Sequence, residues 1–216
     1  MNLSTLPGFA DPVDDAQAVF RAALAALAHP GLPVSLELPP FPLPAAGFSS
    51  GMTALALALC DQDTPLWLDE AADTPEVRHH LRFHCASPLV SQPQSAFFAF
   101  ISRPEAMPRL REFNQGRPEY PDRSATLVLG VDLSLSQGLA LEVTGPGVKG
   151  NDQGLWRGLR LSGLPAWFWD DWEENHAAYP LGVDVVFVGG PGIRLLGLPR
   201  TARVRRIANE EGRACM

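Results

Sequence analysis

Arg82, His84 and Arg200 are the side chains of this sequence that are best suited to hold an anion. Arg82 and His84 precede a Ser-Pro-Leu-Val-Ser-Gln-Pro segment at residues 87–93, and Arg200 follows a stretch that is typical of a strand. An arginine fork matches the oxygens of a phosphate or phosphonate, and a neighbouring histidine can donate or shuttle a proton. Because open α/β sheets often bind ligands at strand ends, the sequence predicts an anion site at these residues.

A second role is open for the same three residues. Arg82 can belong to the solvent-facing side of a helix with Arg78, His79 and His80, and His84 can be a packed histidine. Few acidic residues lie near Arg82 or Arg200 in the sequence, so a buried arginine there would need a partner from elsewhere in the fold. The alternative hypothesis is that these residues brace a contact between subunits.

Two other polar segments suggest phosphate or metal binding less strongly. The Gly-Pro-Gly-Val-Lys-Gly segment at 145–150 could cradle a phosphate with its backbone amides and Lys149. Its spacing is not that of a P-loop, and no serine or threonine follows the lysine, so a turn after a strand is favoured. Asp61 and Asp63 could ligate magnesium, but an aspartate before Thr-Pro is also ordinary turn chemistry, which we favour.

The sequence offers no recognisable catalytic set. Its three cysteines are Cys60, Cys85 and Cys215, an odd number without the paired spacing of a disulfide framework or of a zinc or iron–sulfur site. No Ser-His-Asp or Cys-His arrangement can be assembled from spacing alone. We therefore expect no catalytic residue, no metal and no cofactor in this chain.

An aromatic cluster suggests an interface. Trp167, Trp169 and Trp172 lie with Phe168 in an acidic helix expected at 165–176, and these positions point in several directions around a helix. A single buried stripe cannot accommodate all of them, and aromatic side chains are enriched in interface cores. The three tryptophans are candidates for a subunit contact, and the alternative is a helix sandwiched within its own domain.

Composition excludes several classes of protein. The 216 residues carry a net charge of −7, with one lysine, Lys149, and no basic stripe, which argues against nucleic-acid binding. The acidic N-terminal region does not look like a signal peptide, and the longest apolar run, residues 52–60, is too short to span a bilayer. We expect a cytoplasmic protein that does not enter the membrane.

The expected elements alternate along a single domain, 1–216. A helix follows Asp11 and stops at His29-Pro30-Gly31, a proline-rich extended arm covers 32–48, and residues 52–60 form a helix or a strand. Helices are also expected from Thr74, over 104–113 and over 165–176, with a polar loop at 114–123 between the last two. Strands are expected at 66–68, 95–101, 125–131, 139–143, 183–188 and 193–198, and the arginine-rich residues 200–206 alternate like a strand. A hairpin at 189–192 makes the sheet mixed, so the fold class is α/β, a layered mixed sheet flanked by helices.

Several short motifs follow one another along the chain. They are Phe20-Arg21 with His29-Pro30-Gly31, D-Q-D-T-P-L-W-L at 61–68, L-R-F-H at 81–84, P-L-V-S-Q-P at 88–93, Pro118-Glu119 before A-T-L at 125–127, L-E-V-T-G-P-G at 141–147, P-L-G-V-D at 180–184 and L-P-R-T at 198–201. In this order they resemble the H-subunit family of bacterial carbon–phosphorus lyase, and the resemblance covers nearly the whole chain.

This resemblance implies a role in alkylphosphonate catabolism. It implies a fold like that of pyridoxal-phosphate-dependent transferases without the cofactor site, a homodimer when isolated, and assembly with the sister subunits G, I and J. With G, I and L, the subunit would support transfer of ribose triphosphate from ATP to methylphosphonate with release of adenine, while J cleaves the carbon–phosphorus bond. The alternatives are a free-standing transferase with a pyridoxal or nucleotide cofactor, for which Lys149 would be the Schiff-base lysine, and a non-catalytic dimeric scaffold.

Overall fold

A six-stranded mixed sheet forms the centre of the computed structural model, which describes residues 6–133, 139–148, 156–190 and 192–207. The strand order is β1-β8-β7-β4-β3-β2. The strands are β1 (Val34–Leu36), β2 (Leu66–Leu68), β3 (Phe98–Ile101), β4 (Thr126–Gly130), β7 (Asp184–Gly189) and β8 (Ile193–Leu198). β2, β3, β4 and β7 are mutually parallel, and the β7–β8 hairpin and the β8–β1 pair are antiparallel. The predicted α/β class and mixed sheet are confirmed.

The two faces of this sheet carry two separate cores. Side chains alternate along each strand, so Val128 of β4 lies in one core while Leu127 and Leu129 lie in the other. The first core is closed by α1 (Pro12–Ala28), α2 (Ser50–Leu59) and α3 (Pro75–His84). The second is closed by α4 (Phe168–Ala177) and a three-stranded antiparallel sheet of β6 (Trp156–Leu161), β5 (Leu139–Thr144) and β9 (Arg203–Arg206).

The helices begin and end where the sequence places caps. Asp11 accepts hydrogen bonds from the amides of Val13 and Asp14 at the start of α1, and Thr74 caps α3. α1 ends before Pro30 and Gly31, and Gly31 has a φ of 84°. The ambiguous apolar run at 52–60 lies within a helix, α2, which Ser49 caps and which is buried along most of its length.

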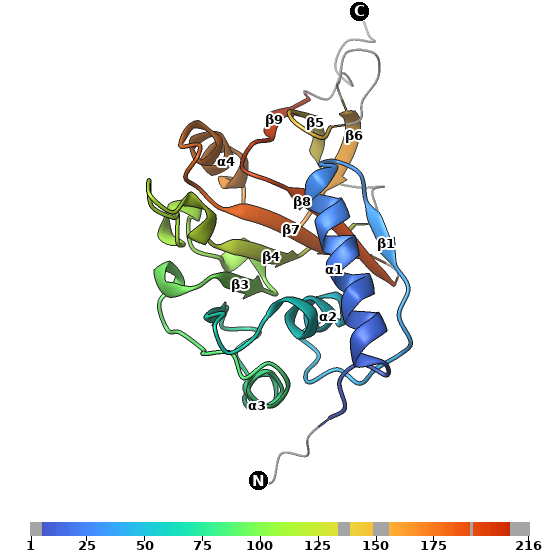
Figure 1. Ribbon diagram of the computed structural model, residues 1–216. Coiled ribbons are helices and arrows are strands. Elements are labelled where there is room, and N and C mark those ends of the chain that lie inside the picture. Colours follow the sequence, from blue (N-terminus) through green and yellow to red (C-terminus); the bar gives the residue numbers. More distant parts are fainter. Residues whose placement is uncertain (1–5, 134–138, 149–155, 191, 208–216) are drawn as a thin grey trace, which may run out of the picture.

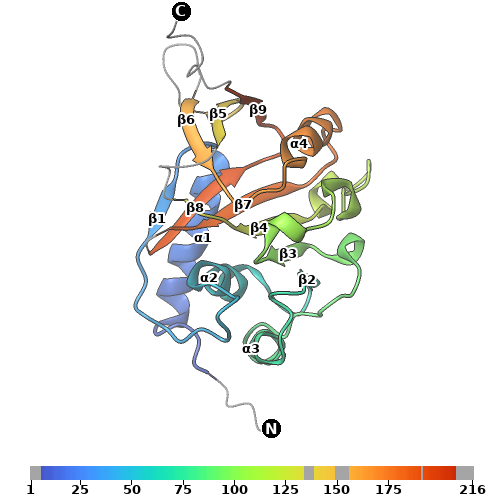
Figure 2. The same cartoon turned by 180° about the vertical axis from the view of Figure 1, so that it is seen from behind.

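α1 can lie against β8 because Gly197 has no side chain. A Cβ atom at this position would meet the backbone oxygen of Ala26 at 2.3 Å, and backbone atoms of a helix cannot give way by a rotamer change. Figures 1 and 2 show α1 crossing one face of the sheet, in front of β8 in the first view and behind it in the second.

Four expectations about the elements need correction. Residues 104–113 do not form one helix but two 3₁₀ turns, Pro104–Ala106 and Leu110–Glu112, because Pro108 between them cannot donate an intrahelical hydrogen bond. The proline-rich arm contains a short strand, β1. A 3₁₀ turn, Pro93–Ser95, precedes β3, which begins at Phe98 rather than at residue 95. Finally, strand β6 was not predicted. Lys149, Pro191 and Cys215 lie outside the described residues.

In the described part of the chain, no helix has both the length and the apolar character that crossing a membrane requires.

Candidate functional site

A cleft of about 900 Å³ lies at the carboxyl ends of the four parallel strands. Residues that follow directly after β2, β3 and β4, most of them polar, line it together with the end of β7. At these strand ends the lining residues are Asp69, Glu70, Ser102, Arg103, Val131, Asp132, Val188 and Gly189. The crevice outside the carboxyl ends of the strands is where open α/β sheets bind ligands, so this cleft is the candidate functional site.

Asp69 fixes the geometry of the cleft rather than offering a free carboxylate. It is 7% exposed, and one carboxylate oxygen accepts a hydrogen bond from the Ala72 amide at 2.9 Å. The other oxygen accepts one from the Arg103 amide at 2.8 Å, which ties the loop after β2 to the loop after β3. Asp69 is therefore a brace between two of the loops that form the site.

The amino-terminal end of α2 also opens into the cleft. Ser49, the capping residue, and Met52 line the cavity, and Ser102 donates a hydrogen bond to the backbone oxygen of Gly47 beside them. A helix amino terminus carries a partial positive charge, whereas Glu70 and Glu105 place carboxylates at the rim. Hydroxyls, carboxylates and a helix amino terminus therefore surround the cavity, an arrangement that can hold a polar ligand.

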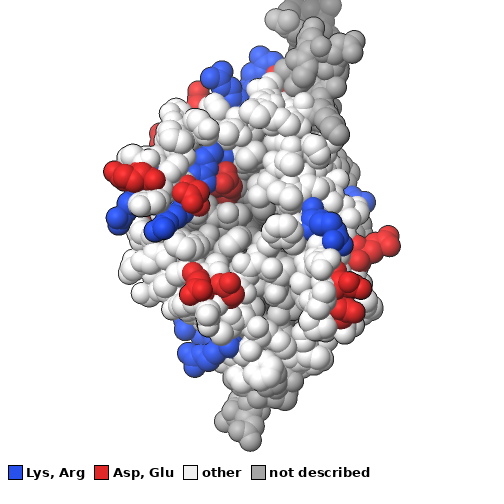
Figure 3. All heavy atoms as spheres, in the orientation of Figure 1, with Lys and Arg blue, Asp and Glu red and all other residues white. Residues whose placement is uncertain are grey.

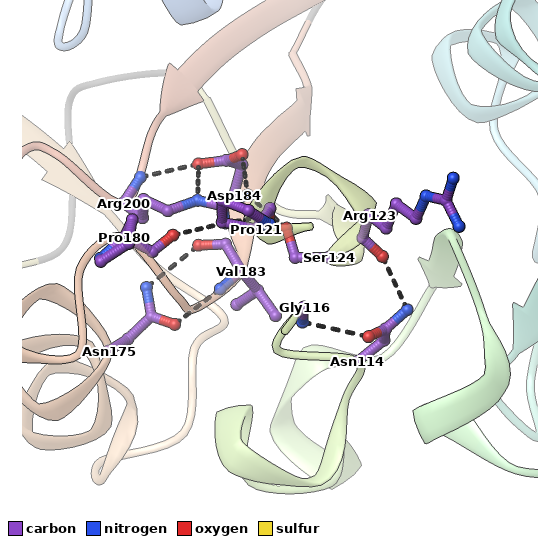
Figure 4. Close-up of polar contacts among 10 residues, drawn as sticks. All are labelled: Asn114, Gly116, Pro121, Arg123, Ser124, Asn175, Pro180, Val183, Asp184 and Arg200. Atoms are coloured by element: carbon purple, nitrogen blue, oxygen red, sulfur yellow. Dashed lines mark hydrogen bonds and ion pairs between the residues drawn. The ribbon is translucent and has the colours of Figure 1, made fainter. Parts of the chain in front are cut away.

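Arg200 is completely engaged within the protein (Figure 4). Its Nε and one terminal nitrogen grip both oxygens of Asp184, at 3.1 and 2.6 Å. The other terminal nitrogen donates to the backbone oxygens of Pro121 and Pro180, at 3.0 and 3.2 Å, and the first also donates to the Ser124 hydroxyl. A guanidinium has five N–H donors, and these five contacts use them all, so the geometry favours a bracing role over anion binding for Arg200.

Arg82 and His84 lie on α3, away from Arg200. No contact joins them to Arg200 among the described residues, and α3 and α4 lie far apart in both ribbon views. Arg82 is exposed, whereas His84 is partly buried with its Nε2 2.8 Å from the backbone oxygen of Leu6. The structure does not bring the three predicted anion-binding residues together, and Arg82 and His84, two residues apart on α3, do not face each other.

The turn at Asp61 is held by hydrogen bonds of its own side chain. The Asp61 carboxylate accepts from the Asp63 amide at 3.0 Å and from the Thr64 hydroxyl at 2.5 Å. These hydrogen bonds, that of Thr64 foremost, lower the pKa of Asp61. They form the side-chain turn that the sequence favoured over magnesium binding. In the described ranges, no three His, Cys, Asp or Glu side chains gather as metal ligands would.

The tryptophans of the α4 region separate into two kinds. Trp172 is 1% exposed and donates its indole N–H to the backbone oxygen of Ala202 at 3.1 Å, so at this position the geometry favours the alternative of a helix sandwiched within its own domain. Because α4 packs against the second core, Trp172 points into that core. Trp167 and Trp169 are partly buried, and Arg109 lies 4.7 Å above the Trp167 ring. Trp167 and Trp169 stay candidates for a subunit contact.

A groove of about 990 Å³ separates α4 from β9, and Trp169 lines it together with arginines of β9. These arginines are paired with side chains of the protein. Arg206 contacts Asp170 at 2.7 Å, Arg205 donates to Glu142 at 2.7 Å, and Arg203 donates to His176 at 2.9 Å. Because two of these three arginines are paired with carboxylates, this groove is a weaker candidate for an anionic ligand than its arginine content suggests.

Comparison with known proteins decides the family. The model of the family described as bacterial phosphonate metabolism protein (PhnH) matches residues 7–205, which is most of the chain. The chain belongs to this family. A similar relative is the alpha-D-ribose 1-methylphosphonate 5-triphosphate synthase subunit PhnH of Rhizobium meliloti (strain 1021), 38% identical over 203 residues, 92% of this chain and 94% of the relative. The resemblance of the sequence motifs to the H-subunit family is thereby confirmed.

A second relative of this PhnH-family chain is a putative C-P lyase subunit protein, HtxG, of Stutzerimonas stutzeri. It is 35% identical over 100 residues, which cover 46% of this chain and 45% of the relative. The two relatives carry names from the same field of chemistry, the metabolism of phosphonates.

Sequence reasoning missed the cleft at the carboxyl edge of the PhnH-family fold. A signal for it was present, because polar residues follow directly after three expected strands: Asp69 and Glu70, then Ser102 and Arg103, then Asp132. In a parallel sheet these positions meet at one edge. Once the parallel order of β2, β3 and β4 is known, the pattern places all five residues around one cavity.

Proposed function

We propose that this chain is the H subunit of a carbon–phosphorus lyase complex. In that role it supports transfer of a ribose triphosphate unit from ATP to methylphosphonate with release of adenine. The observation that carries the proposal is the family match over residues 7–205 together with a full-length relative named as a subunit of this synthase. The sister subunits G, I and J are the proposed partners, and the cytoplasm is the proposed compartment.

The proposal includes four finer features implied by the sequence resemblance. The isolated chain forms a homodimer, and its fold is a variant of the pyridoxal-phosphate-dependent transferase fold. The chain contributes no cofactor chemistry, and cleavage of the carbon–phosphorus bond falls to the J subunit. Of these features, the mixed sheet with helices on both faces bears only on the fold, with which it is compatible.

Within this function the chain binds and positions rather than reacts. The cleft at the carboxyl edge offers hydroxyls, a helix amino terminus and braced loops, which can hold a ligand. Arg82 and His84 stay the proposed contacts for an anionic intermediate or a sister subunit, since the exposed guanidinium of Arg82 is accessible to either. Arg200 serves the fold.

Reconstitution tests the proposal. The purified chain is combined with G, I and L subunits, ATP and methylphosphonate, and adenine release is followed by chromatography. We expect adenine only when all four proteins and methylphosphonate are present. Adenine release by the chain alone would support the free-standing transferase instead, and full activity of G, I and L without this chain would overturn the proposal.

Variants of Arg82 distinguish a ligand contact from a subunit contact. If Arg82 holds an anion, Arg82→Ala assembles normally and loses about tenfold or more in turnover, since a charge-assisted hydrogen bond is worth roughly 1.5–3 kcal/mol. If Arg82 contacts a sister subunit, the same variant fails to assemble. Arg111→Ala, which removes another exposed arginine on a different element, is the matched control.

A further inference from the structure

The charge balance of the cleft at the carboxyl edge limits what the cleft can hold. Among the described residues that line it, carboxylates outnumber guanidinium groups by four to one. The carboxylates are those of Asp69, Glu70, Glu105 and Asp132, and the guanidinium is that of Arg103. A triphosphate in this cavity would lie among like charges, which repel it. The cleft therefore fits a ligand, or a part of a ligand, that carries no negative charge.

The surface outside the cleft does not change this balance on the face seen in Figure 3. There the described arginines are interspersed with carboxylates rather than gathered into one basic patch. A polyanion is held by a cluster of cations that outweighs the nearby anions. The described part of this face offers no such cluster, so a polyphosphate group is expected to find its cations on another protein.

Two carboxylates of the cleft are available to a ligand. Glu70 and Glu105 are exposed, and within the described residues neither forms a hydrogen bond or an ion pair. Asp69 differs from them, because both of its oxygens already accept backbone amides. An ionised carboxylate can only accept hydrogen bonds. The part of the ligand beside Glu70 and Glu105 must therefore present donors, such as hydroxyl groups.

The loops that carry these two carboxylates are held in place before a ligand binds. The Arg103 amide donates to Asp69 at 2.8 Å, which ties the loop after β3 to the loop after β2. A Cβ atom on Gly47 would meet the backbone oxygen of Ala71 at 2.9 Å, so the segment before α2 lies against the loop after β2. Figures 1 and 2 show β3 and β4 ending beside α2. Preset loops lower the entropy cost of holding a ligand.

The inner part of the cleft is apolar. Met52 and Val188 line it and are 1% and 2% exposed, and Val131 adds a further aliphatic side chain. The volume of about 900 Å³ is within the range of sites for small organic molecules and exceeds what a sugar alone would fill. An uncharged ring can pack against this aliphatic wall while hydroxyl groups of the same ligand reach the carboxylates. A nucleoside has both parts.

We propose that the cleft binds a nucleoside, with Glu70 and Glu105 accepting hydrogen bonds from the vicinal hydroxyls of its ribose. An acidic side chain near a strand end binds ribose hydroxyls in many open α/β sheets. The inference rests on the proposed function, in which ATP is a substrate, and adds which part of that substrate this chain holds. The triphosphate group then lies outside the cleft.

The first experiment uses adenosine, which carries no phosphate, as the probe. Isothermal titration calorimetry of the full chain is expected to give a Kd of about 1 mM or tighter. The probe 2′,3′-dideoxyadenosine should bind at least about tenfold more weakly, because it lacks both hydrogen bonds to charged acceptors. Inorganic triphosphate should not compete with adenosine.

Three outcomes of this titration overturn the proposal. They are no binding of adenosine, equal binding of adenosine and 2′,3′-dideoxyadenosine, and displacement of adenosine by inorganic triphosphate. The readout is binding by this chain alone rather than adenine release by the four proteins. A failure here is therefore distinguishable from a failure of the proposed function.

The second experiment assigns the binding to the two carboxylates. Glu70→Gln and Glu105→Gln should each weaken adenosine binding at least about threefold, since a neutral acceptor forms a hydrogen bond roughly half as strong as a charged one. The ratio between the affinities for adenosine and for 2′,3′-dideoxyadenosine should fall toward one, which a purely structural role would not cause. Glu76→Gln is the matched control, because Glu76 is exposed on α3 and does not line the cleft. Circular dichroism checks that each variant is folded. Folded Glu70→Gln and Glu105→Gln variants that keep the wild-type affinity and ratio would contradict the proposed site, as would an equal loss in Glu76→Gln.

Discussion

At the scale of single residues, the structure separates polar groups that serve the fold from those that are available for binding. Arg200 and Asp69 have the residue types of a binding site, yet each has its polar atoms satisfied within the protein. Arg82 is exposed and keeps its guanidinium at the surface. Burial with full hydrogen bonding indicates a structural role, because an anion would have to displace contacts that already exist.

The first prediction concerns Arg200. Its side chain is 11% exposed and that of Asp184 24%, so Arg200→Ala leaves a mostly buried carboxylate with only the backbone amide of residue 200 as a donor and removes the guanidinium from two backbone oxygens. We expect a loss of about 3 kcal/mol in the free energy of unfolding, measured by urea denaturation. Arg200→Lys should recover little of it, because lysine lacks the planar fork. Unchanged stability combined with lost turnover would instead support the hypothesis that Arg200 binds an anion.

The second prediction concerns His80, which is 3% exposed and whose ring nitrogens have no hydrogen-bond partner among the described residues. Burial, and then the nearby His84 and His79, lower its pKa to about 4. The His80 imidazole is therefore harder to protonate in the folded protein than in the unfolded chain, where its pKa has the ordinary value of about 6.5. The contribution of this pKa shift to the free energy of unfolding is complete above about pH 6.5. It is lost as the pH falls toward about 4, because the unfolded chain then binds a proton at His80 before the folded protein does.

His80→Leu should remove this part of the pH dependence. We expect the free energy of unfolding of the variant to fall less between about pH 7 and pH 4.5 than that of the wild type, by roughly 2–3 kcal/mol. Urea titrations at a series of pH values measure the difference, with His176→Gln as the control for a partly exposed histidine. Parallel curves for the wild type and His80→Leu would show that His80 titrates normally.

At the scale of elements, α4 shows why a helix rich in tryptophan need not be an interface. Asp171 of its first turn pairs with Arg109 and accepts the Leu110 amide at 3.1 Å, which anchors α4 to the 3₁₀ turn at Leu110–Glu112. On the same helix, Trp172 reaches the backbone of Ala202, just before β9. α4 is thus held between two segments of its own chain, and only part of its aromatic surface is left for a partner.

The third prediction follows from this arrangement. Trp172→Ala removes a side chain that is 1% exposed and opens a cavity in the second core, so we expect a loss of about 3–5 kcal/mol in the free energy of unfolding. Trp169→Ala, at the partly exposed position, should cost less than about 1 kcal/mol while weakening any subunit contact of this face. Denaturant titration and co-purification with sister subunits measure the two effects, and the reverse ranking of stability would contradict the placement of Trp172.

At the scale of the whole molecule, one sheet is shared by two cores. Because neighbouring residues of β4 and β7 point into different cores, neither core can lose its sheet face while the other stays intact. The single domain expected from the sequence, 1–216, stays a prediction that this arrangement supports.

The fourth prediction is that both cores unfold together. Trp67, Trp167, Trp169 and Trp172 all belong to or pack against the second core, so tryptophan fluorescence reports mainly on that side. Far-UV circular dichroism includes α1, α2 and α3, which cover the first core. We expect the two signals to give coincident urea transitions. Separate midpoints would show that the chain holds two units that unfold independently.

The sequence alone determined the local features, because these depend on residues that are close in the chain. Asp11 and Thr74 cap helices as predicted, Pro30 and Gly31 end α1, and the strands with apolar runs form close to where they were expected, with β3 beginning later than predicted. The ordered motifs were also sufficient to indicate the family, since a resemblance needs the order of residues and not their positions in space.

The tertiary structure alone decided which residues meet. Arg200 contacts Asp184, Pro121 and Pro180, which lie 16, 79 and 20 residues away in the sequence. A local sequence pattern does not predict partners at such separations. The same holds for the cleft, whose polar residues lie apart in the sequence and meet because β2, β3 and β4 are parallel. Trp172 faces the core and Trp169 the groove because α4 packs in one orientation. Long-range packing sets these outcomes, since burial depends on what the rest of the chain places opposite each side chain.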